Sequence, residues 1–310
     1  MEILITGGAG FIGSNLVATI NSDHPEWKIR VIDDLSSGLL SNIENCEVEF
    51  IEESILNLQA LENVAKGVSS IVHLAAIGSV PRSVGAPRPT HEANATGTLN
   101  VLEAAKTNHI RHVVVASSSS VYGSNPNIPR SEYDWTRPLS PYAVSKLATE
   151  AYAGAYSHSY GMKTLAFRFF NVYGPGQRPD HPYAAVIPRF ISAALRGDPL
   201  QIFGDGEQTR DFTYVDSVCH AIQAACSAQI HSAHPVNLAF GSKSTVNELV
   251  KVLEKDFGRK LPRDYLPTRA GDVRDSQADP TLLDQLIPDV NATELSDGIR
   301  RTVQWISENY

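Results

Sequence analysis

The stretch Ile3-Leu4-Ile5-Thr6-Gly7-Gly8-Ala9-Gly10-Phe11-Ile12-Gly13 decides the fold of this chain of 310 residues. Its apolar, β-branched start predicts a strand over residues 2–6, and a helical pattern begins near Ser14. The glycines between them lack Cβ atoms, so the chain can turn tightly and a pyrophosphate can approach the backbone closely. The free N–H groups of the helix N-terminus would then face the phosphates.

An acidic residue follows this glycine turn at the distance typical of dinucleotide-binding proteins. Asp33 ends the next predicted strand, twenty residues after Gly13, where a carboxylate can accept the hydroxyl groups of the adenosine ribose. It would repel the 2′-phosphate of NADP, so NAD is the predicted cofactor. Asp34 and Ser36 would continue along the adenosine. The alternative is a structural glycine turn whose aspartate only caps the backbone.

Short apolar runs alternate with helix-like stretches along the first half of the chain. Strands are predicted at residues 2–6, 28–33, 48–51, 70–75, 112–117 and 164–170. Several of these runs are apolar almost throughout, as expected of strands that helices cover on both faces. The predicted fold is therefore α/β: a doubly wound parallel sheet of the Rossmann type with right-handed crossovers.

A second, smaller, mixed α/β domain is predicted after residue 170, where proline and glycine punctuate the chain. Further elements are predicted as a helix at 183–195, a helix at 213–225, a strand at 236–239 and an amphipathic helix at 293–309. The helix at 213–225 and the strand at 236–239 could return to the first sheet. We therefore expect a Rossmann domain at 1–170 plus about 213–240, and a substrate-binding domain at about 171–212 plus 241–310.

The composition argues against several classes of protein. With 34 acidic and 26 basic residues the formal charge is -8, which disfavours binding to nucleic acid or an anionic membrane through phosphate neutralisation. Cys46, Cys219 and Cys226 are too scattered for a disulfide framework or a zinc site, and the histidines show no ligand spacing, so no metal is expected. No apolar run approaches a membrane span, and the N-terminus lacks the basic flank of a signal peptide. A cytoplasmic location is expected.

A candidate chemical site follows the fifth predicted strand. The serines at 117–120 lie at its C-terminal end, the edge at which such sheets bind ligands. Further on, Tyr142 and Lys146 stand on one face of a helix. An ammonium and a positively charged nicotinamide would lower the pKa of the phenol from about 10, so that Tyr142 could act as a base. The alternative is a solvated helix face, for which this spacing is common.

Further motifs accompany these two sites along the chain. They are His73-Leu74-Ala75-Ala76, Asn94 with Gly97-Thr98-Leu99-Asn100, Val121-Tyr122-Gly123, Phe170-Asn171-Val172-Tyr173-Gly174-Pro175, Arg210-Asp211-Phe212-Thr213-Tyr214-Val215-Asp216 and Arg269-Ala270-Gly271-Asp272. With these motifs the chain resembles, over nearly its whole length, the extended short-chain dehydrogenases/reductases, specifically the NAD-dependent nucleotide-sugar epimerases of the UDP-glucose 4-epimerase type.

The resemblance implies a role for individual residues of this chain. Ser118, Tyr142 and Lys146 would be catalytic. NAD would be bound by Gly7, Gly10, Phe11, Ile12, Gly13, Asp33, Asp34, Ser36, Ser54, Ile55, Leu74, Ala75, Ala76, Asn94, Tyr142, Lys146 and Phe170. The UDP-sugar would be bound by Ser79, Ser118, Ser119, Tyr142, Asn171, Arg178, Val186, Ile202, Phe203, Arg210, Arg269, Asp272 and Ser276. The guanidinium groups of Arg210 and Arg269 match diphosphate oxygens, although surface salt bridges are the alternative.

The activity implied is that of a UDP-hexose 4-epimerase, acting on UDP-glucose and UDP-galactose, or on their N-acetylated counterparts, through a transient 4-keto sugar. A 4,6-dehydratase is the first alternative. Dehydratases of this family carry an Asp-Glu pair directly after the catalytic hydroxyl, and here those positions are Ser119 and Ser120. A non-catalytic NAD sensor on the same fold is the second alternative, and the intact Tyr142 and Lys146 argue against it.

The choice of sugar stays open. Ser276 stands where a bulky residue in the family excludes a 2-acetamido group, so a serine leaves room for one. Arg178 favours UDP-glucuronate, because relatives that epimerise it use an arginine there for the sugar carboxylate. Those relatives, however, favour threonine where this chain has Asn171. The alternative for Arg178 is a loop arginine paired with Asp180.

Assembly into a homodimer is also expected. Apolar positions along residues 94–105 and 143–156 predict two long helices, each with an apolar face left available for packing against another subunit. In the family, the equivalent helices pair across a two-fold axis as an intermolecular four-helix bundle. The alternative is that both helices pack internally against the sheet.

Overall fold

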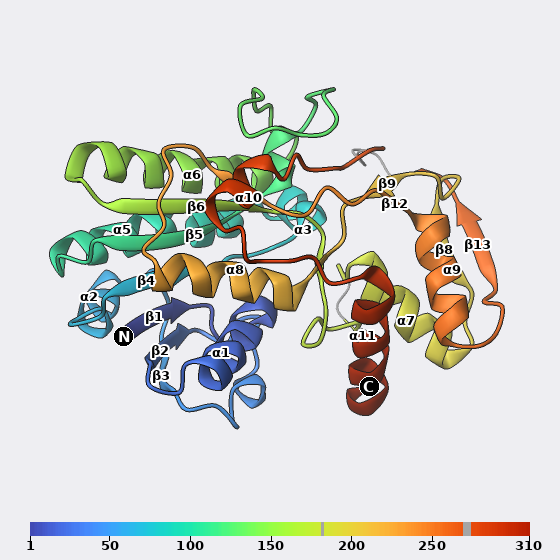
Figure 1. Ribbon diagram of the computed structural model, residues 1–310, viewed down its shortest axis with the longest axis horizontal. Coiled ribbons are helices and arrows are strands. Elements are labelled where there is room, and N and C mark those ends of the chain that lie inside the picture. The colour runs from blue at the N-terminus through green and yellow to red at the C-terminus, as the bar shows by residue number, and fades with distance from the viewer. Residues whose placement is uncertain (181–182, 269–273) are drawn as a thin grey trace.

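The computed structural model describes residues 1–180, 183–268 and 274–310. Over these residues seven parallel strands form the central sheet, in the order β11-β6-β5-β4-β1-β2-β3 (Figure 1). The strands are β1 (Glu2–Thr6), β2 (Lys28–Asp33), β3 (Glu49–Glu52), β4 (Ser70–His73), β5 (His112–Ser118), β6 (Lys163–Phe169) and β11 (Val236–Leu238). The predicted doubly wound parallel sheet is confirmed.

Helices cover both faces of this sheet. They are α1 (Phe11–Asp23), α2 (Leu58–Val64), α3 (Val80–Gly85), α4 (Pro87–His91), the π-helical segment η2 (Glu92–Thr96), α5 (Gly97–Thr107), α6 (Pro141–Tyr160) and α8 (Val215–Ser227). In Figure 1, α2, α5 and α6 lie along one side of the sheet, and α1 and α8 along the other. The helix predicted from residue 94 therefore starts within a π-helical segment.

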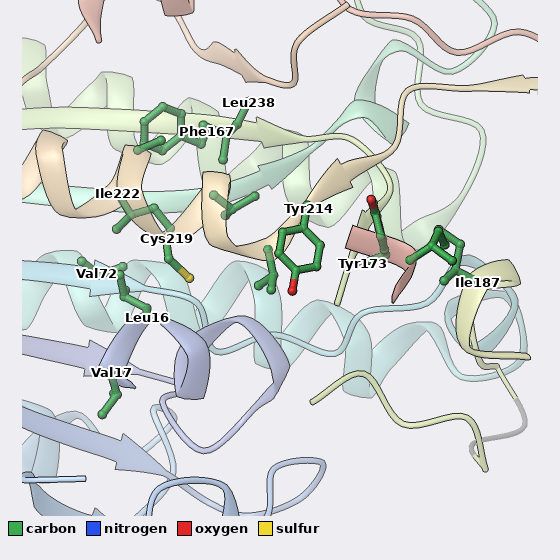
Figure 2. Packing of buried hydrophobic residues seen from close by; sticks show 14 of the residues in the cluster. Leu16, Val17, Val72, Phe167, Tyr173, Ile187, Tyr214, Cys219, Ile222 and Leu238 are labelled. Atoms are coloured by element: carbon green, nitrogen blue, oxygen red, sulfur yellow. The ribbon is translucent and has the colours of Figure 1, made fainter. Parts of the chain in front are cut away.

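The alternation of side chains along the strands explains the two layers of core. Ile3 and Ile5 of β1 point into the cluster beneath α1 and α8, whereas Leu4 points into the cluster beneath α5 and α6. Because each face is covered by helices, all three side chains are fully buried. Figure 2 shows part of the first cluster, in which side chains of α1 and α8 meet those of β4, β6 and β11.

The remaining elements form smaller units beside the sheet. They are η1 (Leu40–Asn42), η3 (Ser119–Tyr122), β7 (Val172–Tyr173), α7 (Val186–Arg196), β8 (Leu200–Phe203), β9 (Thr209–Arg210), β10 (Thr213–Tyr214), β12 (Ser244–Thr245), α9 (Val246–Asp256), β13 (Arg263–Leu266), α10 (Thr281–Leu286) and α11 (Leu295–Asn309). Strand β8 pairs with β13, β9 with β12 and β7 with β10. The helix predicted from residue 213 starts only at Val215, because Thr213 and Tyr214 pair with β7. The division into two domains stays a prediction.

Within the described ranges, no helix is long and apolar enough to cross a membrane.

Helix α11 packs closely against Tyr173. A Cβ atom at Gly298 would lie 2.2 Å from the hydroxyl oxygen of Tyr173, whose ring is 2% exposed. Gly298→Ala should therefore lower the free energy of unfolding by about 1–3 kcal/mol in a urea titration, because a buried ring would have to move. This loss should appear although alanine is the better helix former by roughly 1 kcal/mol. The exposed Ser296→Ala is the matched control, and equal stability of both variants would contradict the packing described.

The carboxylate of Glu254 links α9 to β13. The Glu254 carboxylate accepts hydrogen bonds from Lys260 (2.9 Å), the backbone of Leu261 (3.2 Å) and Arg263 (2.8 Å), and these bonds lower its pKa to about 2. A pKa that is lower in the folded state stabilises the protein above the ordinary carboxyl pKa, and this stabilisation is lost as the pH falls towards 2. Glu254→Gln should thus destabilise the protein at pH 6, by an amount that shrinks as the pH is lowered.

Chemical denaturation at several pH values tests this prediction, with the exposed Glu44→Gln as control. A difference between the wild type and Glu254→Gln that stays constant with pH would contradict it.

Candidate active site

Two cavities lie at the C-terminal edge of the central sheet, among the residues that the structure describes. The first has a volume of about 640 Å³ and the second about 530 Å³. Both are lined by Gly78, Tyr142, Asn171 and Val172. The predicted catalytic tyrosine therefore stands where the two cavities meet.

The glycine turn between β1 and α1 forms one end of the first cavity. A Cβ atom at Gly13 would lie 2.2 Å from the carbonyl oxygen of Gly7, and one at Gly7 would lie 2.6 Å from the backbone nitrogen of Ala75. Gly10 caps α1 without a side chain, and Phe11 and Ile12 of the first turn line the cavity. A helix N-terminus with this open cradle fits a pyrophosphate.

Asp33 lines the same cavity at the end of β2. Its carboxylate accepts hydrogen bonds from the backbone N–H groups of Ala9 (3.0 Å) and Leu35 (2.9 Å). Burial raises its pKa, and these two bonds partly oppose the rise. Asp33 thus caps the glycine turn, as the alternative supposed. Each carboxylate oxygen can still accept a further hydrogen bond from a ribose.

Most residues predicted to bind the cofactor line the first cavity: Gly7, Gly10, Phe11, Ile12, Gly13, Asp33, Asp34, Ser36, Ser54, Ile55, Leu74, Ala75, Ala76, Tyr142 and Lys146. Asn94 and Phe170 do not line it. The Asn94 side chain is buried behind the wall, accepting a hydrogen bond from the Ile77 backbone (2.8 Å) and donating to the hydroxyl of Ser145 (2.9 Å). Phe170 is fully buried, and the preceding Phe169 lines the cavity instead.

Lys146 is a buried cation of α6, 5% exposed. Its ammonium donates to the carbonyl of Ala116 on β5 at 2.7 Å. Burial lowers its pKa to about 8, and the negative charge of Glu150, one turn further along α6, opposes this. Glu150 is itself paired with Arg168 of β6 at 2.8 Å and accepts the hydroxyl of Ser117.

Burial raises the pKa of Tyr142, and a hydrogen bond with the side chain of Ser118 opposes the rise. The ammonium of Lys146, one turn further along α6, is directed at the carbonyl of Ala116. The role of Lys146 and of the nicotinamide charge in lowering the pKa of Tyr142 stays a prediction.

Seven residues predicted to bind the UDP-sugar line the second cavity: Ser79, Tyr142, Asn171, Val186, Ile202, Phe203 and Arg210. Ser118 lines the first cavity, whereas Ser119, Arg178 and Ser276 line neither. The guanidinium of Arg178 forms two hydrogen bonds to the Asp180 carboxylate, at 3.0 and 2.9 Å. Ser276 donates its backbone N–H to the carbonyl of Thr209. The predicted Arg269 and Asp272 lie outside the described residues.

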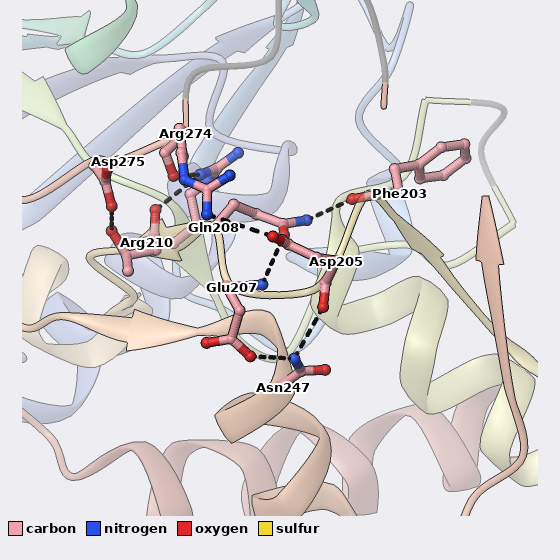
Figure 3. A network of polar contacts seen from close by, with 9 residues as sticks. Phe203, Asp205, Glu207, Gln208, Arg210, Asn247, Arg274 and Asp275 are labelled. Atoms are coloured by element: carbon pink, nitrogen blue, oxygen red, sulfur yellow. Dashed lines mark hydrogen bonds and ion pairs between the residues drawn. The ribbon is translucent and has the colours of Figure 1, made fainter. Parts of the chain in front are cut away.

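A polar network joins Phe203, Gln208 and Arg210, which line the second cavity, to neighbouring segments (Figure 3). The guanidinium of Arg210 donates to the carbonyls of Thr209 (2.8 Å) and Arg274 (3.2 Å). The side chain of Gln208 donates to the carbonyl of Phe203 at 2.8 Å. These bonds connect the loop after β8, strand β9 and the segment that begins at residue 274.

The sequence analysis missed several lining residues, among them Ser37 and Glu53 in the first cavity and Arg189 and Gln208 in the second. Arg189 lies three residues after Val186 on α7, so helical spacing could have placed both on one face. Its guanidinium lies 5.4 Å from the ring centre of Phe203. No sequence signal identified Gln208, because its position depends on the bend after β8.

The described residues hold no group of three or more His, Cys, Asp or Glu arranged for a metal ion. His73 is buried between the hydroxyl groups of Thr6 (2.8 Å) and Thr98 (3.0 Å). Burial and the charge of Lys146 lower its pKa to about 3, so His73 is a neutral hydrogen-bonding residue of the core.

Comparison with known proteins identifies the family. Its model, described as the NAD dependent epimerase/dehydratase family, matches residues 3–239. UDP-glucose 4-epimerase from Mycolicibacterium smegmatis is 35% identical, over 98% of each chain. The structure of UDP-N-acetylglucosamine 4-epimerase from Methanobrevibacter ruminantium, with UDP-N-acetylmuramic acid, is 38% identical, with a TM-score of 0.94 over 100% of this chain and 99% of the other.

A further solved structure is UDP-glucuronic acid 4-epimerase from Bacillus cereus in complex with UDP-glucuronic acid and NAD. It is 32% identical, with a TM-score of 0.92 over 100% of both chains. The resemblance inferred from the motifs is confirmed by these matches. The chain belongs to the NAD dependent epimerase/dehydratase family.

Proposed function

We propose that this protein is an NAD-dependent UDP-hexose 4-epimerase, with UDP-glucose and UDP-galactose, or their N-acetylated counterparts, as substrates. The observation that carries the proposal is the position of Tyr142, which lines both cavities. A base at this junction can reach a group held in either one. The relatives named UDP-sugar 4-epimerases support the same reaction.

The first cavity suits NAD. Its glycine cradle and the first turn of α1 would hold the pyrophosphate, and Asp33 would accept the adenosine ribose hydroxyls. When bound there, NAD would accept hydride from C4 of the sugar and return it to the opposite face of the transient 4-keto sugar. The buried ammonium of Lys146 lies beside Tyr142 in this cavity, where it would bind the nicotinamide ribose.

The second cavity suits the UDP portion. Arg189 and Arg210 bring positive charge to its lining, and Phe203 offers an aromatic ring. Arginine matches diphosphate oxygens. With the nucleotide held here, the sugar would reach the junction, and Tyr142 would take the proton of its 4-hydroxyl group. This lining supports a UDP-sugar as the partner.

Dehydration fits the site less well. A 4,6-dehydratase needs an acid and a base beside the sugar, and the residues that follow Ser118 are the hydroxyl-bearing Ser119 and Ser120. The nearby carboxylate of Glu150 is held by Arg168 behind the site. A non-catalytic sensor would need no base at the junction, where Tyr142 lines both cavities.

The contacts of Arg178 favour an uncharged sugar over UDP-glucuronate. The Arg178 guanidinium is paired with Asp180 and lines neither cavity. The residues common to both cavities, Gly78, Tyr142, Asn171 and Val172, include no cation. A sugar carboxylate at the junction would therefore meet no positive charge from these four residues.

The homodimer and the cytoplasmic location stay proposals. In support of the dimer, α6 exposes the apolar side chains of Val144 (54%) and Tyr152 (36%) beside α5. Such a face would suit a second copy of the chain.

Removing the phenol oxygen tests the proposed reaction. Tyr142→Phe keeps the ring but removes the proton acceptor, so turnover of UDP-glucose or UDP-N-acetylglucosamine should fall by roughly 10²–10⁴-fold. The measurement is epimer formation at saturating substrate, with UDP-sugar binding measured by calorimetry. NAD released by acid should be stoichiometric in the wild type and the variant. Turnover close to that of the wild type would place the base elsewhere.

Substrate choice is tested by initial rates on UDP-glucose, UDP-N-acetylglucosamine and UDP-glucuronate. One of the two uncharged sugars should exceed UDP-glucuronate by at least about tenfold in kcat/KM, because Arg178 is paired with Asp180 and the four residues common to both cavities offer a sugar carboxylate no cation. Arg178→Gln should leave the rates on uncharged sugars unchanged. The proposal of an uncharged sugar is wrong if UDP-glucuronate is preferred and Arg178→Gln removes that preference.

A further inference from the structure

The serines after β5 form a directed hydrogen-bond chain. Ser118 caps the short helix η3, and its Oγ accepts the backbone N–H of Ser120 at 3.2 Å. The same oxygen also accepts the hydroxyl of Ser120 at 3.0 Å. Ser120 is thus the donor in two hydrogen bonds to a predicted catalytic residue.

These two bonds decide what the hydroxyl of Ser118 can do. A serine hydroxyl has two lone pairs and one proton. Ser120 occupies both lone pairs, so Ser118 has only its proton to offer. Ser118 and Tyr142 line the same cavity, and the side chain of Ser118 acts on Tyr142 to lower its pKa. With both lone pairs occupied, the hydroxyl of Ser118 can face Tyr142 only as a donor.

We propose that Ser120 is a positioning residue, which holds Ser118 as a fixed hydrogen-bond donor to the oxygen of Tyr142. The inference rests on the proposed epimerase function. It implies that the sugar hydroxyl gives its proton directly to Tyr142, because Ser118 has no free lone pair to receive it. The O–H bond of the sugar breaks, a phenol O–H bond forms, and Ser118 keeps its own proton.

Ser118, fixed as a donor, stabilises the phenolate form of Tyr142. Without Ser120, the hydroxyl of Ser118 can rotate and act as an acceptor, and the phenolate loses this stabilisation part of the time. Within the described part of the chain, the other charged or titratable residues that line the first cavity are Asp33, Asp34, Glu53, Glu92 and Lys146. Those that line the second cavity are Tyr173, Tyr183, Arg189 and Arg210. Glu150 pairs with Arg168, and the charge of Lys146 acts on the buried His73. Substitution of Ser120 changes none of them.

The test measures the ionisation of Tyr142 in the NAD-loaded protein. Absorbance of the phenolate is followed against pH, with Tyr142→Phe subtracted to isolate this tyrosine. Ser120→Ala should raise the apparent pKa of Tyr142 by about one unit, a tenfold change in ionisation, and Ser120→Thr, which keeps a hydroxyl, should restore the wild-type value. In the Ser118→Ala background, Ser120→Ala should cause no further shift. The exposed Ser124→Ala is the control.

Kinetics give the second readout. In Ser120→Ala the turnover number should fall by about tenfold, and the acid limb of its pH profile should move to higher pH, with KM little changed. An unshifted titration, or a shift of equal size with and without Ser118, would overturn the proposal. If the wild type epimerises no UDP-sugar, the proposed function fails, but the titration still tests the role of Ser120.

Discussion

The close contact between α1 and the glycine turn before it is the constraint on which the rest of the site depends. No side chain fits between Gly13 and the carbonyl of Gly7, so the first turn of the helix packs directly on the glycine turn that follows β1. Since β1 lies between β2 and β4, this start brings the helix N-terminus to the middle of the sheet edge. The first cavity opens there, between Asp33 on one neighbouring strand and Ala75 after the other.

The chemistry depends on the attachment of α6 to two strands. Lys146 is bonded to a carbonyl of β5, and Glu150, one turn later, is bonded to Arg168 of β6. A charge buried without a partner would cost several kcal/mol, so both contacts select one position of the helix. Tyr142 stands one turn before Lys146 and is thereby held at the junction of the cavities.

The sequence was most informative where a residue's role depends on its neighbours in the chain. The predicted strands begin and end within about two residues of those observed, because apolar runs covered on both faces leave a strong signal. The glycine turn could also be predicted, because its shape depends on residues that are close together in the chain. Asn94 and Phe170 were assigned to the cofactor, but tertiary packing turns both behind the cavity wall. The arginine on α7 and the bonds from Ser120 to Ser118 depend on contacts that no motif describes.

The π-helical segment before α5 has a consequence for the register of its helix. A π-helical turn holds one residue more than the α-helical pattern needs, and each residue turns a helix by about 100°. Deleting one residue between Glu92 and Thr96 could regularise the backbone, yet it would rotate the preceding helix away from its neighbours. The amide of Asn94 would then no longer face Ile77 and Ser145. The extra residue of the π-helical segment therefore keeps the side chain of Asn94 in its position between Ile77 and Ser145.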